Sequence, residues 1–199
     1  YDAHRNRLAS LGLHGPGFSG VARLETWEWD GTMWEQVTPR CRDWWSQPAA
    51  TPAPQYGPHM VFDPTRQVAV LYGGSWDNPS AETWEWDGAT WTLRADTGPG
   101  PRWGAAMAFD RLRGKAVLFG GGSPYPNLQN DTWEWDGRSW KLVATTGPAP
   151  RAHHAMVFDE ARGVVVLYGG YAGDVGPFSM DVYGDTWEWN GAPWVERNV

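Results

Sequence analysis

Two arginines occupy matching places in this 199-residue sequence, each directly after a proline. They are Arg102, which follows Pro101, and Arg151, which follows Pro150; Gln55 stands at the corresponding place in an earlier segment. A guanidinium group presents paired donors that match a carboxylate. We therefore expect these three side chains to take part in a ligand-binding site.

Aromatic residues outside the repeated strings described below supply the second kind of binding chemistry. They fall in connecting segments, and their rings can stack on sugars or on side chains of a peptide. The candidates are Trp44, Trp45, Trp76, Trp103, Tyr125 and Tyr171. The alternative also stands: these aromatics cover loops, and the arginines only bond neighbouring carbonyls.

Motifs for catalysis or cofactor binding are absent from the sequence. There is no nucleophile elbow, phosphate loop or zinc-protease motif. His153 and His154 are adjacent at the start of an expected strand, where neighbours point to opposite faces, so they do not readily share a metal. We predict no metal or cofactor, and we favour a binding module over an enzyme.

Charge and composition exclude some partners. The net charge of −7 argues against nucleic acid, whose phosphates require a basic surface. No apolar run is long enough for a membrane-spanning helix. A single cysteine, Cys41, cannot form an internal disulfide and leaves the compartment open.

A repeat of about fifty residues organises the chain. The string Thr-Trp-Glu-Trp-Asp/Asn-Gly occurs four times, each followed by another Trp three residues after the Gly. Upstream of three copies lies a block running from Phe-Asp to Gly-Gly. Each copy predicts two hairpins, that is four strands, a to d, because Asp-Gly between apolar runs favours a tight β-turn. Four strands in about fifty residues are typical of a β-propeller blade.

The motif order resembles the kelch repeat. Pro-Arg precedes strand a, Gly-Gly closes strand b, an acid precedes strand c and a Trp opens strand d; in one unit these are Pro101-Arg102, Gly120-Gly121, Asp131 and Trp140. The resemblance implies a binding face formed by the b–c and d–a loops, with the arginines near the central channel. Kelch propellers include adaptors, oxidases and isomerases, so the family leaves the function open.

We thus predict an all-β, kelch-type propeller in one domain of about four blades. Its units are residues 1–40, 52–95, 99–144 and 148–199, with an insert at 41–51. Strand a of the first unit is missing, which suggests a fragment of a larger propeller or self-association through the open first blade. Twelve repeat tryptophans should be buried, and Trp44, Trp45, Trp76 and Trp103 more exposed.

The functional prediction is a module that binds a protein, peptide or carbohydrate, with an acidic sugar or peptide as the guessed ligand. Two alternatives remain open. One is a carbohydrate-active oxidase or isomerase, and the other is a structural component completed by another chain.

Overall fold

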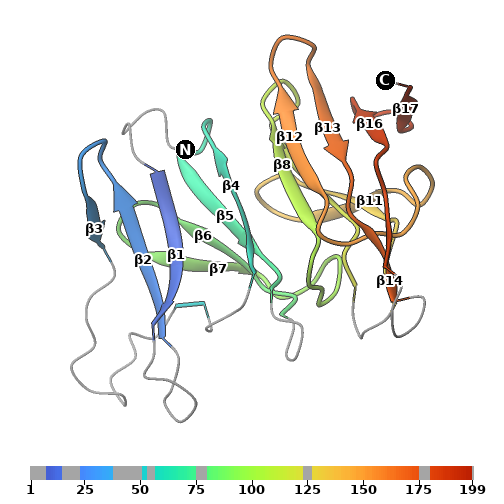
Figure 1. Cartoon of the computed structure of the whole chain (residues 1–199). Helices are drawn as coiled ribbons and strands as arrows, with labels where there is room; N and C mark the ends of the chain where they lie inside the picture. Colours follow the sequence, from blue (N-terminus) through green and yellow to red (C-terminus); the bar gives the residue numbers. More distant parts are fainter. Residues whose placement is uncertain are drawn as a thin grey trace.

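The chain is built from antiparallel sheets (Figure 1). The computed structural model describes residues 8–14, 23–37, 51–52, 57–74, 80–122, 127–174 and 180–198. Within these ranges the regular elements are all β-strands, so no helix there is long and apolar enough to cross a membrane.

Each repeat forms one sheet. Strands consecutive in the chain pair side by side, except that β13 pairs with β16 in the fourth repeat. The first repeat has three described strands, β1 (Leu8–His14), β2 (Arg23–Trp29) and β3 (Trp34–Gln36). The second has β4 (His59–Asp63), β5 (Val68–Tyr72), β6 (Thr83–Trp86) and β7 (Trp91–Ala95). The third has β8 (Ala106–Asp110), β9 (Lys115–Phe119), β10 (Thr132–Trp135) and β11 (Trp140–Ala144). The fourth has β12 (Ala155–Asp159), β13 (Val164–Tyr168), β16 (Thr186–Trp189) and β17 (Val195–Arg197), with the hairpin β14 (Tyr171–Asp174) and β15 (Met180–Val182) in its b–c connection.

The Asp-Gly pairs make the predicted tight turns. In the third repeat the backbone N–H of Asp136 donates to the Ser139 carbonyl at 3.3 Å, and the Asp136 carboxylate accepts the N–H of Arg138 and Ser139. Gly137 has φ of +91°, a conformation that costs glycine little. The prediction of two hairpins per complete repeat is confirmed.

Tryptophan side chains join each repeat to the one before it. The second Trp of each string and the Trp that opens the last strand donate their indole N–H groups backwards, to a Glu and a Thr of the preceding repeat. These bonds are Trp86 to Glu28, Trp135 to Glu85 and Trp189 to Glu134, together with Trp91 to Thr26, Trp140 to Thr83 and Trp194 to Thr132. A buried indole N–H needs an acceptor, so the repeated Thr and Glu fix how successive sheets stack.

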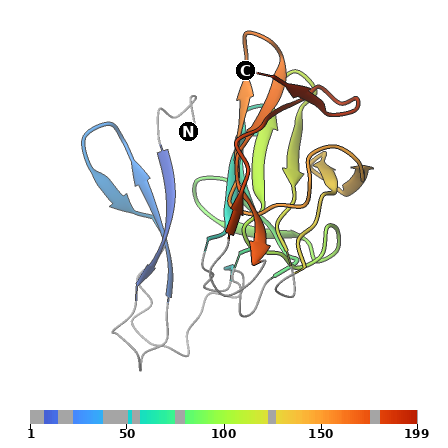
Figure 2. The same ribbon diagram turned by 45° about the vertical axis from the view of Figure 1, so that its right-hand side comes forward.

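The apolar core lies between the sheets. Val70 and Tyr72 of the second repeat pack with Met107, Leu118 and Trp135 of the third, and an equivalent cluster joins the third repeat to the fourth. The first and fourth repeats lie at opposite sides of the molecule (Figures 1 and 2). The expectation that all twelve repeat tryptophans are buried holds for six of them and is wrong for the others. Five are partly buried, and Trp34 is 44% exposed because no described repeat precedes it.

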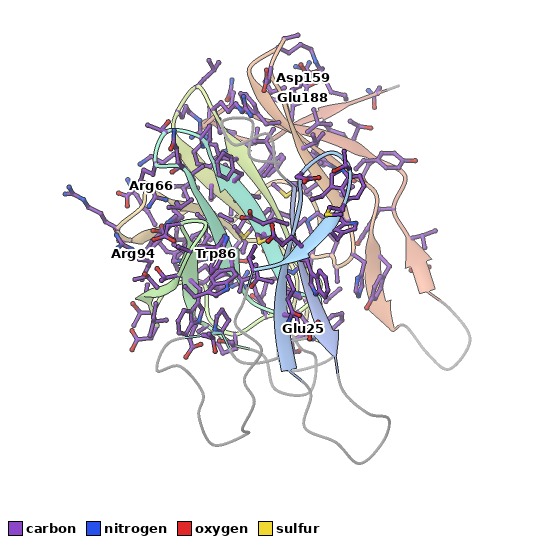
Figure 3. All side chains as sticks on the ribbon, turned by 90° about the vertical axis from the view of Figure 1, so that its left-hand side faces the viewer. Glu25, Arg66, Trp86, Arg94, Asp159 and Glu188 are labelled. Atoms are coloured by element: carbon purple, nitrogen blue, oxygen red, sulfur yellow. The ribbon has the colours of Figure 1, made fainter. Side chains whose placement is uncertain are left out.

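A cluster of charged side chains lies at the a–b turn of each complete sheet. In the second repeat Arg66 binds Asp63 at 2.7 Å and Glu85 at 2.5 Å, and Arg94 reaches the same Glu85 at 3.2 Å (Figure 3). The fourth repeat has the same arrangement, in which Arg162 binds both Asp159 and Glu188.

Candidate functional site

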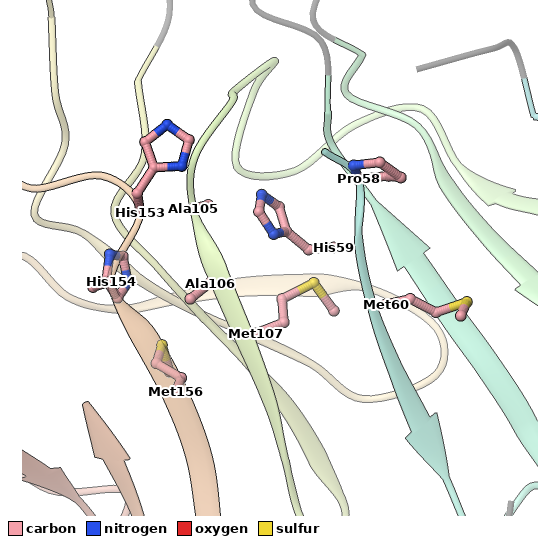
Figure 4. A pocket seen from close by; sticks show the side chains of 9 residues that line it. All are labelled: Pro58, His59, Met60, Ala105, Ala106, Met107, His153, His154 and Met156. Carbon is pink, nitrogen blue, oxygen red and sulfur yellow. The ribbon is translucent and has the colours of Figure 1, made fainter. Parts of the chain in front are cut away.

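A pocket opens where the inner strands β4, β8 and β12 begin, at the end that carries the b–c and d–a connections (Figure 4). Its volume is about 390 Å³, a size suited to a small organic ligand. Three repeats contribute to it, and the side chains are histidines, methionines and small residues. The lining residues are Pro58, His59, Met60, Ala105, Ala106, Met107, His153, His154 and Met156.

His153 departs from the repeat and has an unfavourable backbone. Its φ is +54°, whereas the matching positions of the second and third repeats hold glycines, Gly57 at +59° and Gly104 at +63°. A non-glycine residue in this left-handed region costs about 1–3 kcal/mol and occurs most often at functional sites. The fold therefore holds an imidazole where the repeat pattern calls for glycine.

Two aromatic rings hold His153 in this conformation. The His153 ring stacks on Tyr171 with centroids 5.5 Å apart and 15° between the planes, and its centroid lies 5.7 Å from that of Trp103. The His153 residue itself is exposed. An exposed imidazole between two aromatics at a pocket rim is a suitable surface for stacking a ligand.

His59 and His154 contribute two further imidazoles to the pocket wall, and the pKa of each is lowered. Burial, reinforced by the nearby His153, lowers the pKa of His59 to about 4. Burial, with Arg151 next in effect, lowers the pKa of His154 to about 3. Both rings are therefore neutral at pH 7, so each has one donor and one acceptor nitrogen.

The pocket wall holds buried imidazole nitrogens that are unpaired among the described residues, as are several buried side-chain atoms elsewhere in the chain. The buried Nε2 atom of His59 has no hydrogen-bond partner among the described residues. Buried polar atoms are nearly always paired, and an exception needs an explanation. Met60, Met107 and Met156 occupy one repeated position and add flexible apolar surface beside it. The pocket thus combines neutral imidazole nitrogens with the apolar surface of methionines.

No group of three or more His, Cys, Asp or Glu side chains in the described part of the chain is arranged to hold a metal ion. The argument from strand alternation, which set His153 and His154 on opposite faces, is wrong here. Both precede β12, and the positive φ of His153 turns the chain so that both line the same pocket.

Arg102 and Arg151 are buried and paired, being 3% and 0% exposed. Arg102 donates to both carboxylate oxygens of Asp131 and to the carbonyl of Gly120. Arg151 does the same with Asp185, at 2.6 and 2.7 Å, and with Gly169 at 2.9 Å.

These ion pairs give both arginines a structural task, tying the end of strand b to the acid before strand c. The hydrogen bonds from Arg151 outweigh burial and lower the pKa of Asp185. An incoming carboxylate would have to displace Asp131 or Asp185, so the geometry favours the alternative that the arginines bond neighbouring groups. Ligand binding by Arg102 and Arg151 stays a prediction.

Two of the aromatic candidates, Trp103 and Tyr171, lie within the described residues. Trp103 was expected to be more exposed than the repeat tryptophans, and this is wrong: it is 7% exposed, as buried as Trp84. Its backbone pairs with Gly122 in a two-way bridge at 3.0 Å, which holds it against the sheet. Trp103 and Tyr171 meet at His153, while Gln55, Trp44, Trp45, Trp76 and Tyr125 lie outside the described residues.

Comparison with known proteins rests on structure. No family model matches the chain, and no curated protein matches it. The solved structure of YjhT has a TM-score of 0.57 at 14% identity, over 87% of this chain and 51% of that one. A GH43 glycoside hydrolase engineered to show both endo-xylanase and exo-arabinofuranosidase activity has a TM-score of 0.51 at 12% identity, over 96% of this chain and 38% of that one. The GH74 xyloglucanase from Xanthomonas campestris has a TM-score of 0.53 at 16% identity, over 98% and 29%.

The chain has a β-propeller fold. Four repeats, each forming one antiparallel sheet, fit four blades, so the prediction of an all-β propeller of about four blades is confirmed, while its kelch type stays a prediction. The chain spans between about three-tenths and half of the length of these three structures. At these identities the likeness establishes the fold alone.

Proposed function

We propose that this chain is a carbohydrate-binding module on a kelch-type propeller, and that the pocket between β4, β8 and β12 holds a neutral sugar. The observation that carries the proposal is His153. It stands where the second and third repeats have glycine, its backbone is strained, and its imidazole stacks on Tyr171 at the pocket rim.

Neutral imidazoles favour a neutral ligand over the acidic one guessed from the arginines. His59 and His154 carry no charge at pH 7, since burial lowers both pKa values far below 7. The Arg151 guanidinium, which acts electrostatically on His154, is already paired with Asp185. A hydroxyl group, which donates and accepts at once, matches a neutral imidazole in both directions.

The size and lining of the pocket agree with one sugar ring or two. A volume of about 390 Å³ lies at the lower end of the range for small-molecule sites. The apolar face of a pyranose would lie against the methionines or His153, and its hydroxyls would meet His59. Glycoside hydrolases among the structural neighbours support a carbohydrate ligand at the level of analogy.

A glycan array that carries neutral and acidic oligosaccharides tests the proposal. Wild-type protein should bind glycans with neutral terminal sugars, and His59→Ala should lose at least about tenfold in affinity, the loss expected on removing a buried hydrogen-bond partner. Alanine is the residue at the matching positions Ala106 and Ala155, so the fold should accept it.

Gln67→Gly, at an exposed turn remote from the pocket, serves as the control and should bind as wild type does. Absence of any neutral-glycan binding, or identical binding by wild type and His59→Ala, would contradict the proposal.

A further inference from the structure

The fourth repeat differs from the others in its c–d turn, which joins the Trp string to the last strand. The first three repeats have Asp-Gly at this turn, with the aspartates Asp30, Asp87 and Asp136. The fourth repeat has Asn190 followed by Gly191, which is the only Asn-Gly pair in the sequence. The fourth turn therefore carries an amide where the other turns carry a carboxylate.

An Asn-Gly pair can react with itself. The backbone nitrogen of the glycine forms a bond to Cγ of the asparagine, the bond from Cγ to Nδ2 breaks, and ammonia leaves with the amide proton. Water then opens the resulting cyclic succinimide at either of its carbonyl carbons and yields aspartate or isoaspartate, so water is the only co-reactant. Glycine favours this attack because it has no Cβ that hinders the approach.

Water has access to the c–d turn of every repeat. Asn190 is exposed, and so are the matching Asp30, Asp87 and Asp136. Each of these three aspartates belongs to a repeat that is followed by another sheet of the described chain. A following sheet therefore leaves this turn open, and the exposure of Asn190 is a property of the turn itself.

Hydrogen bonds hold the side chain of Asn190 less firmly than those of its counterparts. In the first three repeats the turn aspartate accepts two backbone N–H groups, from the residues two and three positions further on. Asn190 accepts one N–H group, that of Ala192 at 3.1 Å. The residue after Ala192 is Pro193, which has no N–H to donate.

The backbone of the fourth turn is also less constrained. In the first three repeats the strand ladder reaches the Trp pair beside the turn, which is Trp29–Trp34, Trp86–Trp91 or Trp135–Trp140. In the fourth repeat the ladder ends one pair earlier, at Glu188 and Val195. The backbone N–H of each turn aspartate donates to the carbonyl three residues on, a bond that Asn190 lacks within the described residues. Fewer bonds therefore oppose the approach of Gly191 to the Asn190 side chain.

This turn also positions groups that join the fourth repeat to the third. The two tryptophans beside it donate their indole N–H groups backwards, Trp189 to Glu134 at 3.1 Å and Trp194 to Thr132 at 2.8 Å. Gly191 lies so close to Arg113 that an added Cβ would be 2.6 Å from its guanidinium. Isoaspartate lengthens the main chain by one methylene between the two tryptophans, which disturbs both indole bonds.

We propose that Asn190 is a deamidation site of the folded protein, and that isoaspartate formed there weakens the junction between the third and fourth repeats. Aspartate, the other product, leaves the junction intact because it is the residue of the other three turns. The inference is independent of the proposed sugar site, since none of these residues lines that pocket.

Peptide mass spectrometry of protein incubated for about two weeks at 37 °C and about pH 8 tests the reaction. The peptide with Asn190 should become heavier by about 1 Da and should contain isoaspartate, which electron-transfer fragmentation identifies. The peptide with Asp136 is the control from the same sample and should contain much less isoaspartate.

Pro193→Ser tests the structural reason for the reaction. It gives the fourth turn the residue of the third, Ser139, and restores the second N–H donor. Deamidation of the folded variant should be slower by at least about twofold, the lower end of what one hydrogen bond is worth. In concentrated urea, where the turn is unfolded, both proteins should deamidate at the same rate.

Thermal unfolding tests the effect on the junction. Protein with isoaspartate at position 190, separated by ion exchange after incubation, should unfold at least about 2 °C below the unincubated protein. Asn190→Asp should unfold as wild type does, and Asn190→Ser, which cannot form the succinimide, should keep its unfolding temperature throughout the incubation. The proposal would be overturned by an Asn190 that deamidates in urea but not in the folded protein, by equal rates for folded wild type and Pro193→Ser, or by an isoaspartate form as stable as Asn190→Asp.

Discussion

The strain at His153 can be measured against an internal control. Gln67, in the β4–β5 turn, is the other non-glycine residue with positive φ in the described chain, at +57° against +54° for His153. Its matching positions are again glycines, Gly114 and Gly163. Gln67→Gly and His153→Gly therefore relieve the same backbone strain and restore the repeat residue in both cases.

The two substitutions differ in what they remove. Gln67 is exposed, so Gln67→Gly should raise the free energy of unfolding by about 1 kcal/mol, the lower end of the cost of a left-handed residue. His153→Gly gains the same amount but loses ring contacts to Tyr171 and Trp103. Aromatic pairs contribute about 0.5–1.5 kcal/mol each. The two lost contacts together contribute about 1–3 kcal/mol, so we expect His153→Gly to be unchanged or less stable by up to about 2 kcal/mol.

Chemical denaturation at pH 7, followed by tryptophan fluorescence, gives both values. Thermal unfolding provides a second readout, in which 1 kcal/mol corresponds to about 2–4 °C for a chain of this length. If both variants were stabilised equally, the aromatic contacts would contribute nothing to holding His153, and the reasoning that links its strain to the site would be refuted.

Three further predictions concern the buried polar groups. The pKa of His59 is about 4 in the folded protein and 6.5 when unfolded, so the unfolded state binds more protons between these values. His59 alone should then lower the free energy of unfolding by on the order of 3 kcal/mol as pH drops from 6.5 to 4, so a pH series with His59→Ala should show a fall that is weaker by about this amount. Arg151→Ala should destabilise by about 3 kcal/mol or more, because it leaves Asp185 without its partner, and urea unfolding that shows no loss would refute the structural role of this pair. Trp140→Phe removes the bond to Thr83 and should cost about 1 kcal/mol in the same assay, whereas a neutral result would mean that the indole bond does not stabilise the junction.

The fold could be predicted from the sequence because its signals are repeated. The Trp string occurs four times and ends in Asp-Gly in three copies and in Asn-Gly in the fourth. These residues favour a tight turn through local backbone conformation alone. Strand pairing, hairpin positions and the burial of half of the repeat tryptophans follow from such local rules together with the period of the repeat. Trp34 is exposed because burial also depends on a neighbouring sheet, which the string itself does not specify.

The candidate site was less predictable, because it consists of departures from the repeat. Arg102 and Arg151 recur at one position, and recurrence here reflects a hydrogen-bonded clamp to Asp131 and Asp185. His153, by contrast, occurs once where the other repeats have glycine. Comparing the repeats position by position could have identified it, whereas strand alternation could not, since a positive φ interrupts that alternation.

Histidine-selective ¹⁵N NMR tests the central claim, a neutral sugar in the His59–His153 pocket, most directly. Protein labelled at histidine is titrated in turn with D-galactose, D-glucose, D-mannose and N-acetyl-D-glucosamine at pH 7. At least one sugar should shift the ring resonances of His59 and His153 in a saturable way, and the shift at His59 should vanish or weaken in His153→Gly. Ring resonances of His59 and His153 that stay unmoved by all four sugars would contradict the account.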